Sequence, residues 1–225
     1  MDSSDGAPPP MFEALDEETT RDLRAAMSEL RLRRGEILFL EGEPGDRLYV
    51  IADGKIKLGH AAPDGRETLI AVLGPGEMLG ELALFDPGPR AATATAIAPT
   101  RLLELRHDDL TGILAGRPEL SSQLLQSLAR RLRRTNAALA DLVFSDVPGR
   151  VAKALLDLAK RFGERVDEGI RLVHDLTQEE LAQLVGASRE TVNKALSEFG
   201  NRGWIRLEGR AVLVLDEARL IKRAR

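Results

Sequence analysis

The chain has 225 residues, of which 43% are hydrophobic and 30% are charged, and it contains no cysteine. The length suits one large domain or two modest ones, and the missing cysteine excludes disulfides, thiol catalysis, iron–sulfur clusters and cysteine-based zinc sites. No apolar run reaches the ~18 residues of a membrane-spanning helix, so we expect a cytoplasmic protein with no membrane segment. The formal net charge of −4 is uneven, since residues 1–144 carry −6 and residues 145–225 carry +2. This difference is a faint indication that the second part has an acidic partner.

The first half of the chain predicts a tail, a short helix and then many short strands. Residues 1–10, MDSSDGAPPP, lack the basic start and apolar core of a signal peptide, and their composition predicts a disordered tail. Residues 11–30 are expected to form a short amphipathic helix. From Gly35 to about Leu105, short apolar runs alternate with Pro-Gly and Asp-Gly pairs. Turn-forming pairs at this frequency predict a compact antiparallel β-barrel or roll.

One segment of the predicted roll stands out by its charges. Residues 80–96, GELALFDPGPRAATATA, are small and largely apolar, with one acidic residue near their start, Glu81, and one basic residue, Arg90. Such groups are seldom fully buried unless they are paired with something. The segment therefore predicts that both side chains are held for a purpose.

A long helix is predicted after the roll. Residues 118–143 begin with Pro118, which suits the first position of a helix. Their apolar positions repeat at spacings of three and four, as in the seam of a coiled coil, and favour a helical dimer over a helix that packs on its own roll. The seam consists of Leu125, Leu128, Leu132, Thr135, Leu139 and Leu142. Residues 146–150, DVPGR, then predict a hinge, because adjacent Pro and Gly interrupt a helix.

The last part of the chain predicts a helix-turn-helix. Thr177 and Glu180 have the spacing of a capping box that opens a helix. Gly186 is expected to end that helix, and Ser188 is expected to cap a second one. Two helices joined by a tight turn that contains Gly form a helix-turn-helix. Residues 204–216 are expected to form a two-stranded wing after it.

Over about residues 11–225, these features resemble the cyclic-AMP receptor protein (Crp/Fnr) family of bacterial transcription regulators. GELALFDPGPRAATA resembles the phosphate-binding cassette of cyclic-nucleotide domains, and QEELAQLVGASRETVNKAL resembles the helix-turn-helix of the family. FSDVPGRVAKALL is similar to the actinobacterial cyclic-AMP-responsive branch. The resemblance implies an α+β fold with a jelly-roll-like antiparallel β-roll for cyclic nucleotides over 11–116, a dimerisation helix over 117–144, a hinge over 145–149 and a winged helix-turn-helix over 150–225.

The resemblance implies a cyclic-AMP site in the roll and on the long helix. A cyclic nucleotide offers an anionic phosphodiester, which suits the Arg90 guanidinium, and a ribose hydroxyl, which suits the Glu81 carboxylate. By resemblance, the ribose end lies at Gly80, Glu81 and Leu82, the phosphate at Arg90 and Ala91, and further contacts, including those to adenine, at Arg131, Thr135 and Asn136. One alternative is that Glu81 and Arg90 form a structural salt bridge in a roll without ligand. Another is that Thr135 only fixes the register of the dimer.

The second helix of the helix-turn-helix is expected to read DNA. Its N-terminal end enters the major groove, where Arg can bind guanine bidentately and Glu can accept a hydrogen bond from cytosine. Lys194 stands where the family often has Arg, so its contact is with guanine or with a phosphate. The DNA-binding residues are predicted to be Thr177, Ser188, Arg189, Glu190 and Lys194, with further phosphate contacts from Arg202 and Arg206. By resemblance, the site on DNA is a palindrome with TGTGA-type half-sites.

The sequence thus predicts a dimeric, cyclic-AMP-responsive transcription regulator, with RNA polymerase as a further partner, and not an enzyme. No catalytic residue, cofactor or metal site is expected. His60, His107 and His174 are isolated from one another, so we expect ordinary surface or turn histidines rather than metal ligands. The alternative is a regulator of the same fold that is independent of ligand or senses another nucleotide. Ala91 has no hydroxyl to bond a guanine amino group, which favours cyclic AMP over cyclic GMP.

Overall fold

The computed structural model describes residues 17–62, 67–86, 88–115 and 117–224. The tail predicted over 1–10 lies outside these residues. The chain divides into two compact units, the first made of Met1–His60 with Ile70–Leu132 and the second of Ala61–Leu69 with Arg133–Arg225. Within the described ranges, no helix is both long and apolar enough to cross a membrane.

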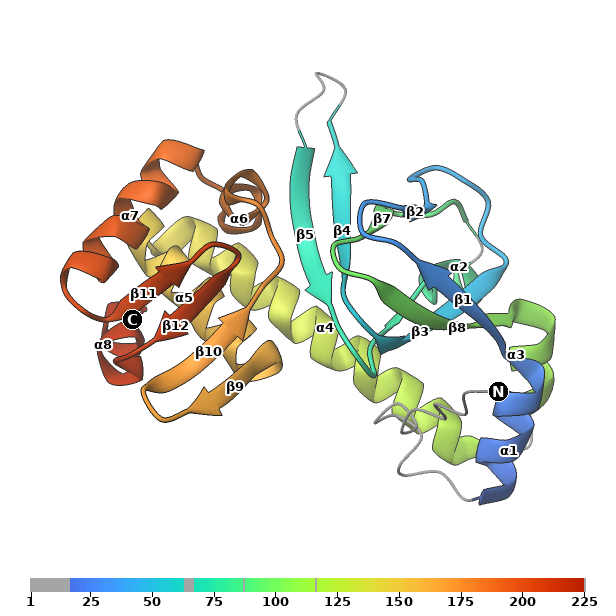
Figure 1. Cartoon of the computed structure of the whole chain (residues 1–225). Coiled ribbons are helices and arrows are strands. Elements are labelled where there is room, and N and C mark those ends of the chain that lie inside the picture. Colours follow the sequence, from blue (N-terminus) through green and yellow to red (C-terminus); the bar gives the residue numbers. More distant parts are fainter. Residues whose placement is uncertain (1–16, 63–66, 87, 116, 225) are drawn as a thin grey trace. The chain divides into compact units, whose positions relative to one another are not determined.

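Two four-stranded sheets dominate the first unit, and their strand orders are β1-β8-β3-β6 and β2-β7-β4-β5 (Figure 1). The ladders β1–β8, β8–β3 and β3–β6 in the one sheet, and β2–β7 and β7–β4 in the other, are antiparallel. The strands are β1 (Ser28–Leu32), β2 (Ile37–Phe39), β3 (Arg47–Asp53), β4 (Ile56–Ala61), β5 (Glu67–Leu73), β6 (Met78–Leu79), β7 (Thr93–Ala96) and β8 (Thr100–Arg106). The predicted antiparallel roll is confirmed.

The two sheets share one apolar core. On β7, Ala94 and Ala96 are buried whereas Thr93 and Thr95 are only half-buried, which is the alternation expected of a strand with one face on a core. The core cluster takes side chains from strands of both sheets, namely Phe39, Tyr49, Ile51, Ile56, Leu73, Leu79, Ala94, Ala96 and Leu102. The roll is therefore closed by the packing of one sheet on the other.

A second apolar cluster joins helices to the roll. The helices of this unit are α1 (Glu17–Ala26), α2 (Leu82–Phe85), α3 (His107–Leu114) and the first part of α4 (Pro118–Phe144). Leu23 of α1, Leu110 of α3 and Leu120 of α4 pack with residues of β3, β6 and β8. The helix predicted over 11–30 is wrong at its end, because residues 28–32 form β1. There the ladder with β8 outweighs the helical pattern of the sequence.

The long helix α4 begins at Pro118, as predicted, and its apolar positions divide into two sets. Leu120 and Leu124 are buried in the first unit, and Leu128 packs against the same cluster. The other leucines of the predicted seam are more than half exposed, and these are Leu125, Leu132, Leu139 and Leu142. The chain thus leaves an apolar face of α4 uncovered. Leu128 differs from the other seam leucines, because it packs on the roll of its own chain, which was the alternative to a dimer seam.

The second unit combines helices with a four-stranded antiparallel sheet of order β11-β12-β10-β9. Its elements are α5 (Val147–Phe162), β9 (Gly163–Val166), β10 (Gly169–Val173), α6 (Gln178–Val185), α7 (Arg189–Asn201), β11 (Ile205–Glu208), β12 (Ala211–Val214) and α8 (Glu217–Arg223). The helix-turn-helix (α6, α7) and the wing (β11, β12) are confirmed. The hairpin β9–β10 was not predicted, because all four residues of β9 are exposed and show no alternation.

The junction between α4 and α5 is short. The helix α4 ends at Phe144, and α5 begins at Val147 with Asp146 as its N-cap. Gly149, part of the segment predicted to be a hinge, lies inside α5, where its backbone N–H donates to the Asp146 side chain at 2.9 Å. A two-residue connection therefore separates two regular helices, and the domain boundaries drawn from the sequence remain predictions.

Candidate functional site

Glu81 and Arg90 are both buried in the first unit, with exposed fractions of 1% and 6%. The turn before Glu81 depends on Gly80, whose φ is +84°. A Cβ at Gly80 would lie 2.5 Å from Arg90 Nη1 and 2.7 Å from the Arg47 carbonyl oxygen. Only glycine therefore allows the chain to pass this close to the arginine and to deliver Glu81 beside it.

The side chain and the backbone of Arg90 are both anchored. Its Nη1 donates to the Gly80 carbonyl at 3.1 Å. Its guanidinium carbon lies 4.4 Å from the ring centre of Phe39 and 5.8 Å from that of Tyr49. Its backbone N–H donates to the Glu43 carbonyl at 2.8 Å. The guanidinium is thus held between a carbonyl and two aromatic rings.

Glu81 is paired with Arg131, which lies in the same unit. Arg131 of α4 donates from Nη1 to Glu81 Oε1 and from Nη2 to the Met78 carbonyl. The Glu81–Arg90 salt bridge considered as an alternative is therefore not the pairing that the structure shows. Burial raises the pKa of Glu81 above its ordinary value, and the positive charges of Arg131 and Arg90 oppose that shift.

Glu81 and Arg90 each have one buried polar atom without a hydrogen-bond partner among the described residues. These atoms are Oε2 of Glu81, an acceptor, and Nε of Arg90, a donor. An unsatisfied buried polar group costs about 1–3 kcal/mol, so two of them in one sequence segment require an explanation. A single ligand with a hydroxyl and an anionic group can satisfy both atoms.

The other predicted pocket residues are less enclosed. Leu82, on α2, and Ala91, next to Arg90, are exposed. Thr135 and Asn136, on the turn of α4 that follows Arg131, are exposed and belong to the second unit. The structure thus brings Gly80, Glu81, Arg90 and Arg131 together, and it places Leu82 and Ala91 next to them in the chain.

The helix-turn-helix has the caps that its sequence predicts. Thr177 Oγ1 accepts from the Glu180 N–H at 3.1 Å, and Glu180 Oε2 accepts from the Thr177 N–H at 2.7 Å. Gly186 ends α6 with φ +63°. Ser188 Oγ accepts from the Thr191 N–H at 3.2 Å and so caps α7. Both helix starts and the tight turn are therefore confirmed.

The second helix of the helix-turn-helix, α7, presents a polar face to solvent. Val192, Leu196 and Phe199 are buried, as their spacing predicts. Arg189, Glu190 and Lys194 are exposed along with Ser188. Among the described residues, Arg189 and Lys194 form no ion pair. Their charges are thus available to an external partner.

The two arginines predicted to touch phosphate after α7 are already paired within the chain. Arg202 lies 2.8 Å from Glu198 and its guanidinium stacks 5.1 Å from the Trp204 ring. Arg206 lies 2.6 Å from Glu168. A phosphate contact from either would have to replace an ion pair. Exposed ion pairs contribute only about 0–1 kcal/mol to stability, so breaking one would require little free energy. Neither arginine, however, is an unpaired cation that already awaits a phosphate.

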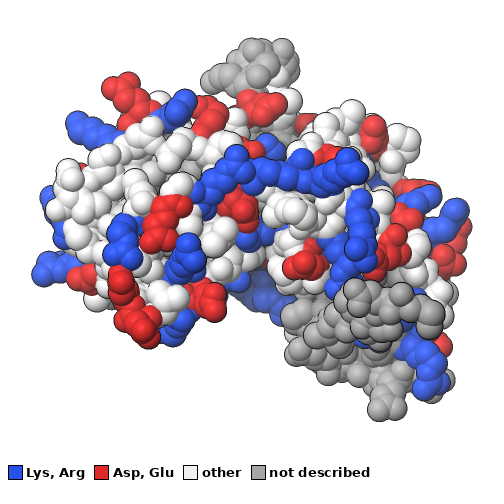
Figure 2. All heavy atoms as spheres, viewed as in Figure 1, with Lys and Arg blue, Asp and Glu red and all other residues white. Residues whose placement is uncertain are grey.

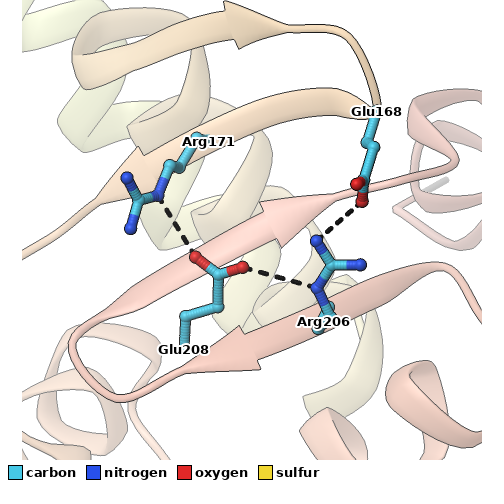
Figure 3. Close-up of polar contacts among 4 residues, drawn as sticks. All are labelled: Glu168, Arg171, Arg206 and Glu208. Carbon is cyan, nitrogen blue, oxygen red and sulfur yellow. Dashed lines mark hydrogen bonds and ion pairs between the residues drawn. The ribbon is translucent and has the colours of Figure 1, made fainter.

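Figure 3 shows that the Arg206 pair is part of a longer chain of contacts across the wing. Arg206 Nε lies 3.4 Å from Glu208, whose other oxygen lies 3.2 Å from Arg171 of β10. Glu168 comes from the turn between β9 and β10, so the network ties that hairpin to the wing. On the face drawn in Figure 2, basic and acidic side chains are likewise interspersed. Charge on this face therefore does not by itself mark a DNA-binding surface.

Arg150, which was not predicted from the sequence, makes three hydrogen bonds that join parts of the second unit. Arg150 of α5 donates to the carbonyls of Val185 at 2.8 Å, Gly186 at 3.1 Å and Ser145 at 2.8 Å. The first two are at the C-terminal end of α6, where helix carbonyls have no partner inside the helix. Because all three acceptors are backbone atoms, no side-chain pattern in the sequence could have pointed to them.

Each of the three histidines has different surroundings in the structure. His60 lies 2.7 Å from Glu41, and His107 begins α3. His174 lies in a connecting segment, as expected, but it is buried, and its Nδ1 accepts from the Leu176 N–H at 3.1 Å. Within the described part of the chain, no group of three or more His, Cys, Asp or Glu residues could hold a metal ion.

Comparisons with known proteins agree with this division of the chain. Residues 29–117 match the family model described as cyclic nucleotide-binding domain. Residues 149–223 match the model described as Crp-like helix-turn-helix domain. The two matches cover the roll and the second unit's winged helix-turn-helix.

Full-length relatives are also found. The chain is 56% identical over 215 residues to the CRP-like cAMP-activated global transcriptional regulator of Mycobacterium tuberculosis, covering 96% of each chain. It is 36% identical over 214 residues to the cyclic AMP receptor protein of Thermus thermophilus, covering 95% of each. Among solved structures, it is similar to the c-di-GMP-responsive global regulator CLP of Xanthomonas campestris, with 26% identity, a TM-score of 0.76 and coverage of 88% of this chain and 99% of that one.

Proposed function

This chain belongs to the Crp family of transcription regulators, and on that premise we propose that it is a dimeric DNA-binding regulator controlled by cyclic AMP. Its relatives regulate transcription and are not enzymes. The nucleotide acts as a ligand rather than as a cofactor. We expect the protein to act in the cytoplasm on bacterial DNA and to contact RNA polymerase there.

The observation that carries the ligand proposal is the pair of unsatisfied buried atoms, Glu81 Oε2 and Arg90 Nε. A charge-assisted hydrogen bond from Arg90 suits the cyclic phosphate, and Glu81 suits the ribose hydroxyl. Gly80 lets the backbone approach the ligand closely, with Leu82 and Ala91 beside it. In the proposal, Arg131, Thr135 and Asn136 complete the site from α4, the last two at the adenine.

Calorimetric titration with cyclic AMP tests the ligand proposal. Arg90→Gln removes the cation, so it should weaken binding by about 1.5–3 kcal/mol, the range for a hydrogen bond to a charged group. Arg24→Gln, which alters an exposed arginine of α1, is the matched control and should bind like the wild type. Absence of heat with the wild-type protein, or equal affinities for wild type and Arg90→Gln, would overturn this assignment.

The DNA proposal rests on the exposed face of α7. Arg189 and Glu190 lie in its first turn, where a recognition helix reaches base edges, and Ser188 caps it. Lys194 follows one turn later, and Thr177 at the start of α6 is proposed to touch a phosphate. Binding to a duplex with TGTGA-type half-sites, compared with a scrambled duplex at the same salt concentration, tests this reading.

The uncovered apolar face of α4 supports dimerisation. Two copies that join their Leu132 and Leu139 faces would bury leucines that this chain leaves in solvent. A twofold dimer presents two recognition helices about 34 Å apart, which matches half-sites ~10 bp apart on one face of the duplex. Sedimentation of the protein with and without the duplex measures the stoichiometry.

The second candidate function is a regulator of the same fold that is independent of ligand or senses another nucleotide. The similarity to a c-di-GMP-responsive regulator is the observation that keeps it open. Titration of cyclic AMP, cyclic GMP and c-di-GMP under the same conditions separates the two candidates. Because Ala91 lacks a hydroxyl, we expect cyclic AMP to bind more tightly than cyclic GMP.

A further inference from the structure

We propose that Phe39 and Tyr49 form an aromatic support that holds the Arg90 guanidinium ready for the ligand's anion and keeps it apart from Glu81. The inference rests on the proposed function, since it assigns positioning residues to that same site. Phe39 ends β2 and Tyr49 lies on β3, so each of the two sheets supplies one ring.

The contacts that define the support are short and buried. The Arg90 guanidinium carbon lies 4.4 Å from the Phe39 ring centre, within the range of a cation–π interaction, and 5.8 Å from the Tyr49 ring centre. The two rings lie 6.0 Å apart and are tilted by 32°. All three side chains are more than nine-tenths buried. Because all three side chains are buried, the attraction between the cation and the ring faces is stronger than at a surface.

A support is needed because Glu81, whose carboxylate feels the charge of Arg90, is an alternative partner for that arginine. The two side chains have opposite charges, and the charge of Arg90 lowers the pKa of Glu81 against the effect of burial. A direct pair would satisfy Glu81 Oε2 and Arg90 Nε at once, but it would remove both from the ligand. In the structure, Arg90 instead bonds to the Gly80 carbonyl and lies against Phe39. The rings thus hold the cation without using the carboxylate.

The expected benefit is pre-organisation. A free arginine side chain has many rotamers, and freezing one on binding weakens affinity by roughly two- to tenfold. An arginine that is already held avoids that loss. The pattern is not visible in the sequence, because Phe39, Tyr49 and Arg90 come from distant segments. The pairing of β2 with β7 brings Phe39 to Arg90, and the packing of the other sheet adds Tyr49.

Binding measurements on Phe39→Leu test the proposal. Leucine keeps an apolar side chain in the core but removes the ring, so cyclic AMP should bind about three- to tenfold more weakly. Ile56→Val, in the same core cluster but without a contact to Arg90, is the control for general loosening. It should lose stability and keep its affinity. An equal loss of affinity in Ile56→Val would overturn the proposal.

A double-mutant cycle separates positioning from packing. Lysine at position 90 keeps the charge but lacks the planar guanidinium that stacks on a ring. The loss caused by Phe39→Leu should therefore shrink to less than about twofold in the Arg90→Lys background. If Phe39→Leu costs the same factor in both backgrounds, Phe39 does not act through Arg90 and the proposal is wrong.

A readout without nucleotide keeps this inference distinct from the proposed function. In the ¹⁵N–¹H spectrum of the nucleotide-free protein, the Arg90 Nε–H signal, assigned by its absence in Arg90→Lys, should be protected from exchange and shifted by the rings. Phe39→Leu should abolish the ring shift. A wild type that binds no cyclic AMP but shows this signal would overturn the proposed ligand and leave the support standing. A signal unchanged by Phe39→Leu would overturn the support.

Discussion

At the scale of single residues, burial of the Glu81 carboxylate lowers the stability of the folded protein at neutral pH. Its carboxylate is buried, and burial raises its pKa above the ordinary value of 4.5. The folded protein therefore binds a proton at Glu81 more readily than the unfolded chain does. It follows that the contribution of Glu81 to stability falls as pH rises from about 4.5 through the raised pKa of the folded state. Such a cost is expected where a group serves binding rather than folding.

Glu81→Gln makes this cost measurable. Glutamine does not titrate, so the variant should gain stability relative to the wild type as pH rises from 4.5 to 7.5. Thermal unfolding of both nucleotide-free proteins across this range gives the difference at each pH. The same variant should lose affinity for cyclic AMP, because the amide is a weaker acceptor than the carboxylate. A stability difference that is constant with pH would contradict the shifted pKa.

At the scale of elements, α7 has a buried apolar face and an exposed polar face, and the latter is the proposed recognition face. Val192, Leu196 and Phe199 anchor the helix, whereas Arg189 and Glu190 face solvent. Substitution on the exposed face should therefore change recognition without changing the fold.

Arg189→Ala should weaken binding to the palindromic duplex by about 1–3 kcal/mol and relax the preference at one guanine. Fluorescence anisotropy with operator variants at fixed salt measures both effects. Arg202→Ala is the matched control, because Arg202 is paired with Glu198 and should change affinity by less and equally for all sequences. Equal losses for both variants across all operators would refute base reading by Arg189.

A second feature at the scale of elements is the set of hydrogen bonds by which Arg150 connects α5 to the end of α6. Its guanidinium serves three carbonyls, two of them at the C-terminus of α6, where a positive charge is favoured by the helix dipole. Hydrogen bonds that involve a charged group contribute about 1.5–3 kcal/mol, and partial exposure places Arg150 towards the lower end.

Arg150→Gln should therefore lower the free energy of unfolding by about 1–2 kcal/mol in urea, with Arg150→Lys intermediate because it keeps the charge but loses the fork. Since α6 carries α7, the variant should also bind DNA more weakly at temperatures where it is folded. A variant with wild-type stability and wild-type DNA affinity would show that the three hydrogen bonds are incidental.

At the scale of the whole molecule, α4 belongs to both compact units and carries the exposed leucine seam. Thr135 is the polar member of that seam and is itself exposed. In the proposed function it joins the ligand to the dimer interface, so that occupancy of the pocket biases the DNA-binding units.

Thr135→Leu should strengthen the apolar interface and delete a contact to the base. We expect a dimer that persists but loses most of its response to cyclic AMP, where a coupling of ~1–3 kcal/mol corresponds to 5–150-fold in DNA affinity. DNA binding measured with and without cyclic AMP gives the coupling directly. If the variant keeps the full response, Thr135 serves only to set the register of the helices.

Local patterns in the sequence determined most of the architecture. The capping box at Thr177, the turn at Gly186 and the cap at Ser188 each involve residues within a few positions of one another, so the sequence alone predicts them. The frequency of turns predicted the roll for the same reason. The helix expected over 11–30 failed at its end because a strand ladder with a distant segment, β8, decides the conformation there.

Only the tertiary structure determined which residues of the site contact one another. The sequence placed Glu81 and Arg90 in one segment but could not show that Glu81 pairs with Arg131, 50 positions away, rather than with Arg90. Nor could it show that Phe39 and Arg90 come into contact, since that requires β2 to pair with the distant strand β7, which follows Arg90. Short-range hydrogen bonds are encoded by neighbouring residue types, whereas contacts across a core depend on which surfaces the whole chain buries.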